Sequence, residues 1–408
     1  MSTTPDLPDT ARCPVVHQFP FPRKTPVDIS PELDRLRTHE PVCRVRMATG
    51  DEAWLVTRYD DVRFVLDDPR FSMKEASGDN AAELMPMVKL FPGLFSLDGA
   101  EHARSRQLLA RGFRTWDTQS FRSWLTKTTD ELALDLLADN PPADLIAGFC
   151  EPLVTRVACR LLGLTSEQLT EFRTHFRMII SVGGLTSAQF GAHWDALRSL
   201  VLGICDARRA DPGDDMISDL IAGNTGERVI PEANLVGLLF SLIAALGHSP
   251  VTQVSYGLVT LLRHPDQWDL LIRRPELVHA ATAEILRYGV AFEVEHVRVA
   301  KEDVQVGGVR IARGDAVLTS IAAANRDETK FTDPARFDIT RADNDHLAFG
   351  HGPHVCAGSD LGNFMILSSL RSLCPLAPTL RLAVPDDNLF LLSENSHSYS
   401  LGAVPVCW

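Results

Sequence analysis

The chain has 408 residues, of which 45% are hydrophobic, and its formal net charge is −13 at pH 7. This composition suffices for a large core, whereas the acidic charge and the lack of a Lys/Arg cluster argue against nucleic-acid binding. The N-terminus lacks the charged-then-apolar pattern of an export signal. The longest apolar run, Leu235 to Gly247, is shorter than the roughly 20 residues that span a bilayer. We therefore expect a cytoplasmic protein with neither a membrane nor a nucleic-acid partner.

No Gly/Ser run, Pro-rich tract or charge block divides the chain, so residues 29–408 are predicted to form one large domain. Residues 1–28 are expected to form a loose N-terminal arm, because the first dozen are polar and include prolines. The sequence Ser30-Pro31-Glu32 predicts the first helix, since a cap is followed by a proline at the first helical position and then an acid.

Helical periodicity dominates the rest of the chain, and strand signals are few. Residues 54–57 are typical of a strand, and residues 304–311, with two glycines at their centre, predict a hairpin. Thr165 and Gln168 predict a capping box at a helix start. The last thirty residues are strand-like and rich in loops. The expected fold is mainly α with a minor β part.

The longest predicted helix runs from about Pro231 to Arg263, and its first half is almost wholly apolar. Such a helix is buried on all sides, which predicts a scaffold packed around one central element. Pro250 lies inside it and lacks the N–H that would bond to the carbonyl of Leu246. We therefore expect the helix to kink or widen at this proline.

The eight cysteines are widely and irregularly spaced, without a CxxC pair, and most are expected to be reduced, buried thiols. Cys356 differs, because it lies in the segment FGHGPHVCAG, Phe349 to Gly358. Two glycines and a proline predict a tight loop here, and an apolar helical stretch from Leu361 to Leu373 follows it.

Cys356 is thus expected at a helix N-terminus, where N–H donors and the helix dipole favour a thiolate. A thiolate in such a place can bind a haem iron and favour cleavage of an O–O bond. Two alternatives remain open. The thiol could be inert, or it could bind zinc with His351 and His354, although no residue is spaced to complete the usual four ligands.

The loop resembles that of the cytochrome P450 superfamily, and of its soluble bacterial members in particular. It matches every fixed position of FGxGxHxCxG, and the resemblance extends from about Ile29 to the C-terminus. It implies a single helical domain around a buried haem b (iron protoporphyrin IX), with Cys356 as the iron ligand. It also implies a ferredoxin and a ferredoxin reductase as electron donors, since the chain has no flavin or iron–sulfur segment of its own.

The same resemblance assigns roles to basic residues. His102 and Arg106 match an HxxxR helix that contacts the haem propionates, and two further residues match other propionate partners. Cations suit these carboxylates. The cofactor-binding residues expected are His102, Arg106, Arg298, Phe349, His354 and Cys356.

A second group matches a structural brace behind the haem loop. Glu284 and Arg287 match the ExxR helix, where a spacing of three puts both on one face. Arg336, in the segment FTDPARF, is expected to complete the buried triad.

The oxygen-activating helix departs from the family pattern of a small residue, an acid and a threonine. The gap-free alignment puts Ala245, His248 and Ser249 at these positions, and a second register puts Ser249 and Pro250 at the last two. Neither supplies a carboxylate. We expect Ser249 and His248 to tune proton delivery, with the contribution of His248 declining as pH rises above 6.5.

The resemblance also places the substrate pocket, around an apolar loop, the central helix, residues 290–294 and a C-terminal tip. Glu293, Glu295 and His296 add polarity near the haem edge, which suits a ligand with amide or indole N–H groups. The pocket residues expected are Phe91, Leu94, Phe95, Leu242, Ala245, Leu246, Ala291, Phe292 and Ser396.

These features favour an oxidase of bacterial secondary metabolism that acts on a bulky aromatic or peptide-like compound, such as a tryptophan-containing cyclodipeptide. The missing acid suits radical coupling of aromatic groups, a reaction that some family members with altered helices perform. The alternatives are an ordinary hydroxylating monooxygenase and a non-catalytic haem-binding protein.

Overall fold

A computed structural model describes residues 15–78, 80–84, 93–114, 118–180, 185–226, 229–289, 291–385, 388–389 and 400–408. The fold is mainly α-helical with a small β part, as predicted. The α-helices are α1 (Pro31–His39), α2 (Tyr59–Asp67), α3 (Met73–Ala76), α4 (Gly99–Phe113), α5 (Gln119–Ala138), α6 (Glu151–Leu162), α7 (Ser166–Ile180), α8 (Ser187–Ala210), α9 (Met216–Gly223), α10 (Glu232–Gly247), α11 (Ser249–Leu262), α12 (Pro265–Arg273), α13 (Val278–Tyr288), α14 (Ile321–Ala324) and α15 (Ser359–Leu376).

Shorter helical turns are η2 (Leu94–Ser96), η3 (Ile146–Cys150), η5 (Pro275–Leu277) and η6 (Gly352–His354). The strands are β1 (Val16–Gln18), β2 (Val42–Arg46), β3 (Glu52–Val56), β4 (Phe71–Ser72), β5 (Ala143–Asp144), β6 (Arg298–Ala300), β7 (Val304–Val306), β8 (Val309–Ile311), β9 (Ala316–Thr319), β10 (Arg381–Leu382) and β11 (Pro405–Cys407).

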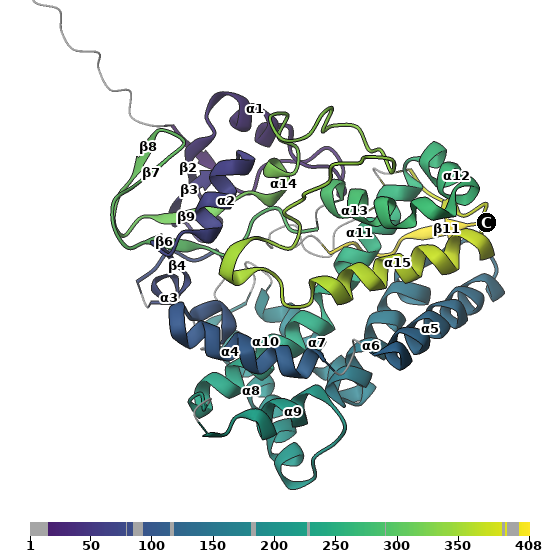
Figure 1. Cartoon of the computed structure of the whole chain (residues 1–408), viewed down its shortest axis with the longest axis horizontal. Helices are drawn as coiled ribbons and strands as arrows, with labels where there is room; N and C mark the ends of the chain where they lie inside the picture. The colour runs from purple at the N-terminus through teal and green to yellow at the C-terminus, as the bar shows by residue number, and fades with distance from the viewer. Residues whose placement is uncertain are drawn as a thin grey trace, which may run out of the picture.

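The strands of the main sheet gather on one side of the molecule, together with α1 and α2, and helices make up the larger remainder (Figure 1). Each part has its own buried cluster, one built on the sheet and one on the helices. The main sheet has the order β1-β2-β3-β9-β6-β4. β6 pairs antiparallel with β9, with Arg298 opposite Val317, and this pairing fixes the position of the predicted propionate partner Arg298.

The N-terminal boundary differs from the prediction. Val16–Gln18 form β1, which pairs in parallel with β2, and Phe19 and Phe21 are buried in the sheet core. The expectation of a loose arm over residues 1–28 is therefore corrected for residues 15–28, because β-pairing and two aromatic rings attach this segment to the body. Residues 1–14 lie outside the described residues.

The predicted helix starts and the hairpin are confirmed. The Ser30 side chain accepts a hydrogen bond from the backbone N–H of Glu32 at the start of α1. Thr165 and Gln168 exchange reciprocal hydrogen bonds of 3.0 and 3.2 Å before α7. β7 and β8 form the hairpin predicted over residues 304–311.

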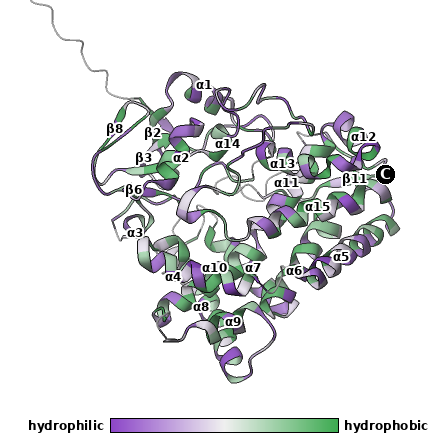
Figure 2. Ribbon diagram, viewed as in Figure 1, coloured by the Kyte–Doolittle hydropathy of each residue, from purple (hydrophilic) through white to green (hydrophobic). Residues whose placement is uncertain are grey.

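The central helix, predicted as one element from Pro231 to Arg263, is broken into α10 and α11. His248 has φ −120° and ψ −56° between them, so the kink expected at Pro250 lies two residues earlier. Figure 2 shows this element in largely hydrophobic colours. The segment Glu232–Leu262 is long and apolar enough to cross a membrane, and it is longer than the predicted apolar run from Leu235 to Gly247. However, 72% of its apolar window is buried inside the protein, as in the core helix of a globular fold.

Candidate active site

The cysteine loop is held by backbone conformations that favour glycine. Gly350 and Gly352 have φ values of +73° and +69°, in the left-handed region that residues with a Cβ rarely adopt. A Cβ on Gly352 would also lie 2.8 Å from the Leu66 carbonyl of α2. The N–H of Cys356 donates to the Phe349 carbonyl at 2.8 Å, which closes the loop, and α15 begins three residues after the cysteine.

The Cys356 side chain is the exposed cysteine among those described. Desolvation by the neighbouring protein raises the pKa of this thiol, while a hydrogen bond from the Gly358 backbone and the charge of Arg106 act in the opposite direction. A thiolate at this helix N-terminus therefore stays a prediction. A bound metal cation would supply the remaining stabilisation.

The predicted propionate partners gather around this loop from three elements. Arg106 of α4 donates to the Val355 carbonyl at 2.8 Å. The imidazole of His102, also on α4, lies 3.9 Å from that of His354, centroid to centroid. Arg298 reaches the same region from β6, where its charge and that of His354 both act on the buried carboxyl of Glu295.

The electrostatics of this group favour an anionic ligand. Burial, together with the neighbouring charges of His354 and Arg106, lowers the pKa of His102 to about 4. Asp98, which the sequence did not single out, lies 3.8 Å from His354. Burial opposes ionisation of Asp98, but hydrogen bonds from His354 and Ser72 hold the pKa of its carboxyl well below the usual range.

Two buried donors in this group point to a ligand. Within the described part of the chain, Nε2 of His102 and Nη1 of Arg298 have no hydrogen-bond partner. Buried polar atoms without partners are costly, and ligand carboxylates that accept from them would satisfy both. A cysteine sulfur beside buried cations thus fits an iron porphyrin, with Cys356 on the iron and His102, Arg106, Arg298 and His354 near the propionates. The zinc alternative gains no support, since no cluster of three metal-binding side chains occurs among the described residues.

In the brace behind the loop, the arginine predicted to complete the triad was wrong. Glu284 and Arg287 are fully buried and form hydrogen bonds of 2.7 and 2.8 Å. The third member is Arg341, whose Nε donates to Glu284 at 3.1 Å, whereas the Arg336 side chain is 63% exposed near Asp338. Arg336 contributes its backbone carbonyl, which accepts from Arg287. The chain turns between the two arginines, and spacing in the sequence gave no signal of that turn.

The oxygen-side helix, which comprises α10 and α11, has one row of solvent-accessible residues along its length, called here the accessible line. Ser241, Ala245 and Ser249 are partly or fully exposed at a spacing of four, while the residues between them are buried. This arrangement agrees with the register that puts Ala245 at the small position and Ser249 at the alcohol position. His248 turns away and packs its ring 5.5 Å from Phe176 of α7.

His248 is neutral at neutral pH. Burial lowers its pKa to about 4, and the nearby guanidinium groups of Arg177 and Arg173 act in the same direction. With this pKa the imidazole is uncharged at pH 7 and carries a single N–H, so it is a weak proton donor there. The expected change in its charge therefore lies near pH 4 and not near pH 6.5, and its role as a proton relay stays a prediction.

The described end of the predicted pocket loop lies against the central helix. A Cβ on Gly93 would lie 2.6 Å from the Ser241 hydroxyl, so the turn holding Leu94 and Phe95 packs against α10. The Phe95 ring lies 4.6 Å from that of His296. Ala245 and Phe292 are accessible, whereas Leu94, Leu242, Leu246 and Ala291 are buried and belong to the helical core. Phe91 and Ser396 lie outside the described residues.

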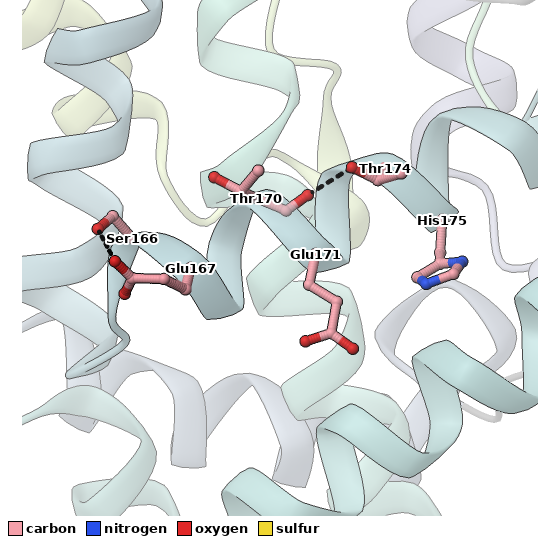
Figure 3. Close-up of a pocket in the computed structure, with 6 residues that line it drawn as sticks. All are labelled: Ser166, Glu167, Thr170, Glu171, Thr174 and His175. Atoms are coloured by element: carbon pink, nitrogen blue, oxygen red, sulfur yellow. Dashed lines mark hydrogen bonds between the residues drawn. The ribbon is translucent and has the colours of Figure 1, made fainter.

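A separate hollow of about 430 Å³ lies on the exposed face of α7 (Figure 3). The residues that line it are of polar or charged type, Glu167 and Glu171 among them, and Thr174 donates to the backbone of Thr170 at 2.8 Å. None of its residues belongs to the cysteine loop, to the basic group or to the accessible line of α10. It is a feature of the surface and has no part in the chemistry of Cys356.

The α-rich fold, the cysteine loop and the buried cations define a haem-thiolate protein. Residues 260–373 match the family model described as Cytochrome P450. The chain is 35% identical to "Putative cytochrome P450 141" of Mycobacterium tuberculosis (strain CDC 1551 / Oshkosh), over 96% of this chain and 98% of that protein. It is 36% identical to "Nocardicin C N-oxygenase" of Nocardia uniformis subsp. tsuyamanensis, with the same coverage.

Solved structures agree with this assignment. The putative thioether synthase SgvP, involved in the tailoring step of griseoviridin, superposes with a TM-score of 0.90 at 34% identity, over 97% of this chain and all of that one. The protein therefore belongs to the cytochrome P450 family, and it is a cytochrome P450 monooxygenase. This assignment to a family of enzymes sets the non-catalytic alternative aside. The haem iron, when bound, would supply the oxidising chemistry.

Proposed function

We propose that this enzyme oxidises a bulky aromatic or peptide-like secondary metabolite, such as a tryptophan-containing cyclodipeptide, by oxidative radical coupling. The names of relatives support the coarser class, oxidation of a bacterial secondary metabolite: a nocardicin C N-oxygenase, a mycinamicin IV hydroxylase/epoxidase and a putative thioether synthase. The thioether synthase is named for forming a bond to sulfur, so a relative of similar fold is associated with bond formation.

The observation that carries the proposal is the position of His248. Its ring is buried against α7 and uncharged at pH 7, so the position of the missing acid offers only a weak proton donor. The polar side chains on the accessible line are then the hydroxyls of Ser241 and Ser249, and Ser249 is the one at the break. In this proposal an oxygen-side helix without an acid is matched to a reaction that ends in hydrogen abstraction from two aromatic partners and not in insertion of oxygen.

The coupling reaction balances without oxygen in the product. Two C–H or N–H bonds break, one bond joins the aromatic groups, and two electrons and two protons leave the substrates. Two further electrons from a ferredoxin, with two protons from water, complete the reduction of dioxygen to two water molecules. Haem b, a ferredoxin with its reductase and a cytoplasmic location are parts of the same proposal.

The polar groups at the pocket edge support a ligand with N–H donors. Glu295 lies beside His296, whose ring contacts Phe95, and burial raises the pKa of the Glu295 carboxyl. Carboxyl and carbonyl oxygens at this edge can accept from amide or indole N–H groups, while Phe95 and Phe292 offer apolar faces.

The test begins with a screen of cyclodipeptides and other aromatic metabolites for a change in the haem absorption spectrum. The best ligand is then turned over with a surrogate ferredoxin and reductase under ¹⁸O₂. We expect a coupled product, two substrate units or two rings joined, without the label. Label in the main product would reject coupling and establish hydroxylation, the second candidate, which the accessible Ser249 hydroxyl favours.

A further inference from the structure

A buried arginine lies against the break in the central helix. Arg173 of α7 is 5% exposed, and its Nε donates to the Gly247 carbonyl at 2.5 Å. Its Nη1 donates to the Thr155 hydroxyl of α6 at 2.6 Å and lies 3.6 Å from the Glu151 carboxylate. One guanidinium thus joins α6, α7 and the last residue of α10.

The Gly247 carbonyl needs this donor because of the break. In a continuous helix the N–H of Val251 would bond to Gly247, but here it donates to His248 at 3.2 Å. Pro250 has no N–H to offer to the turn before it. A carbonyl left without a donor inside the protein is costly, and a charged donor makes a strong replacement.

We propose that Arg173 is a positioning residue for the oxygen-side helix, which fixes the break at Gly247–His248 and thereby the place where Ser249 begins α11. The arginine does not touch a substrate or the cofactor, since its contacts are to α6 and to the backbone of α10. This positioning role of Arg173 applies to any substrate, and it is independent of whether the product forms by coupling or by hydroxylation.

The surroundings of the guanidinium explain why a neutral donor would not suffice. Glu151 also accepts from Arg177, at 3.3 Å, so one carboxylate serves two arginines. The ring of the neutral His248, which lies 5.5 Å from that of Phe176, is near enough for the charge of Arg173 to lower its pKa. Arg173 can contact α6 and α10 at once because its five N–H groups form a rigid fork, which a lysine lacks.

The first test measures hydrogen exchange by mass spectrometry in haem-loaded protein, for peptides covering the break, residues 245–255. Arg173→Met should exchange roughly tenfold faster there, because the carbonyl loses a charged donor. Arg173→Lys should recover part of the protection. Arg177→Met, which removes a partly exposed arginine that shares Glu151, should leave these peptides unchanged.

The second test separates positioning from mere stabilisation. Imidazole and 4-phenylimidazole both bind haem iron, but the phenyl group extends over the oxygen-side wall, so the ratio of their dissociation constants reports the position of α11. Arg173→Met should change this ratio by about fivefold, a shift of roughly 1 kcal/mol, with the ferrous carbon-monoxide band retained. A ratio equal to wild type, an equal response in Arg177→Met or faster exchange spread evenly over the whole chain would each overturn the proposal.

Discussion

Cys356 lies three residues before α15 with its side chain exposed, and desolvation by the neighbouring protein raises the pKa of its thiol. A bound metal would stabilise the thiolate at this position. Cys356→Ser should abolish the red-shifted Soret band of the reduced, carbon-monoxide-bound protein, because serine oxygen is not a thiolate donor. Cys407→Ser, on β11, is the matched control and should leave the band in place. An unchanged band in Cys356→Ser would contradict the assignment of the iron ligand.

The two arginines that follow the ExxR helix separate clearly by burial. Arg341 donates to the buried Glu284, whereas Arg336 is mostly exposed. Arg341→Ala should lower the free energy of unfolding by about 1–3 kcal/mol, because a buried carboxylate loses a charged donor. Arg336→Ala should change it by less than about 0.5 kcal/mol, as is usual at the surface. Urea unfolding of the two variants distinguishes them, and equal losses would restore Arg336 to the brace.

Ser249 and His248 should contribute unequally to oxygen chemistry. Because the pKa of His248 is about 4, its charge does not change between pH 6 and 8. His248→Gln should therefore leave the shape of the pH profile of product formed per electron unchanged over that range. Ser249→Ala should lower product formation, by less than the roughly 100-fold effect of a full general acid or base. A profile that flattens only in His248→Gln would show that the imidazole titrates there.

At the scale of elements, the break in the central helix changes the effect that Pro250 is expected to have on stability. The residue lies in the first turn of α11, where a missing N–H costs little, and not in a helix interior. Pro250→Ala should thus change the free energy of unfolding by less than about 1 kcal/mol. Val254→Pro, inside α11, should lower it by about 3 kcal/mol or more. Chemical unfolding measures both, and a large loss in Pro250→Ala would mean that the proline itself maintains the break.

The stability of the whole molecule should decrease in mild acid because of its buried imidazoles. His248 has a folded-state pKa of about 4, below the ordinary value of 6.5. As pH falls from 6.5 to 4 the unfolded chain takes up a proton that the folded chain does not, so unfolding becomes easier. This one group would lower stability by up to roughly 3 kcal/mol over that window.

The measurement is urea unfolding at several pH values. His248→Gln should make the decline between pH 6.5 and 4 shallower, since the variant has no imidazole to protonate at this position. His39→Gln, at an exposed residue at the end of α1, should retain the wild-type slope. If both variants behave like wild type, the acid sensitivity arises elsewhere.

The sequence by itself predicted the iron ligand, and it determined the α-rich fold, the helix starts at Ser30 and Thr165, and the hairpin. These predictions depend on local rules of capping, turn residues and periodicity, and on a loop motif formed by ten consecutive residues. Only the tertiary structure decided that Arg341 and not Arg336 contacts Glu284, that β1 joins the sheet, and that His248 faces α7. Each of these outcomes depends on which distant segments pack together, and burial then sets both charge and position, which spacing along the chain does not encode.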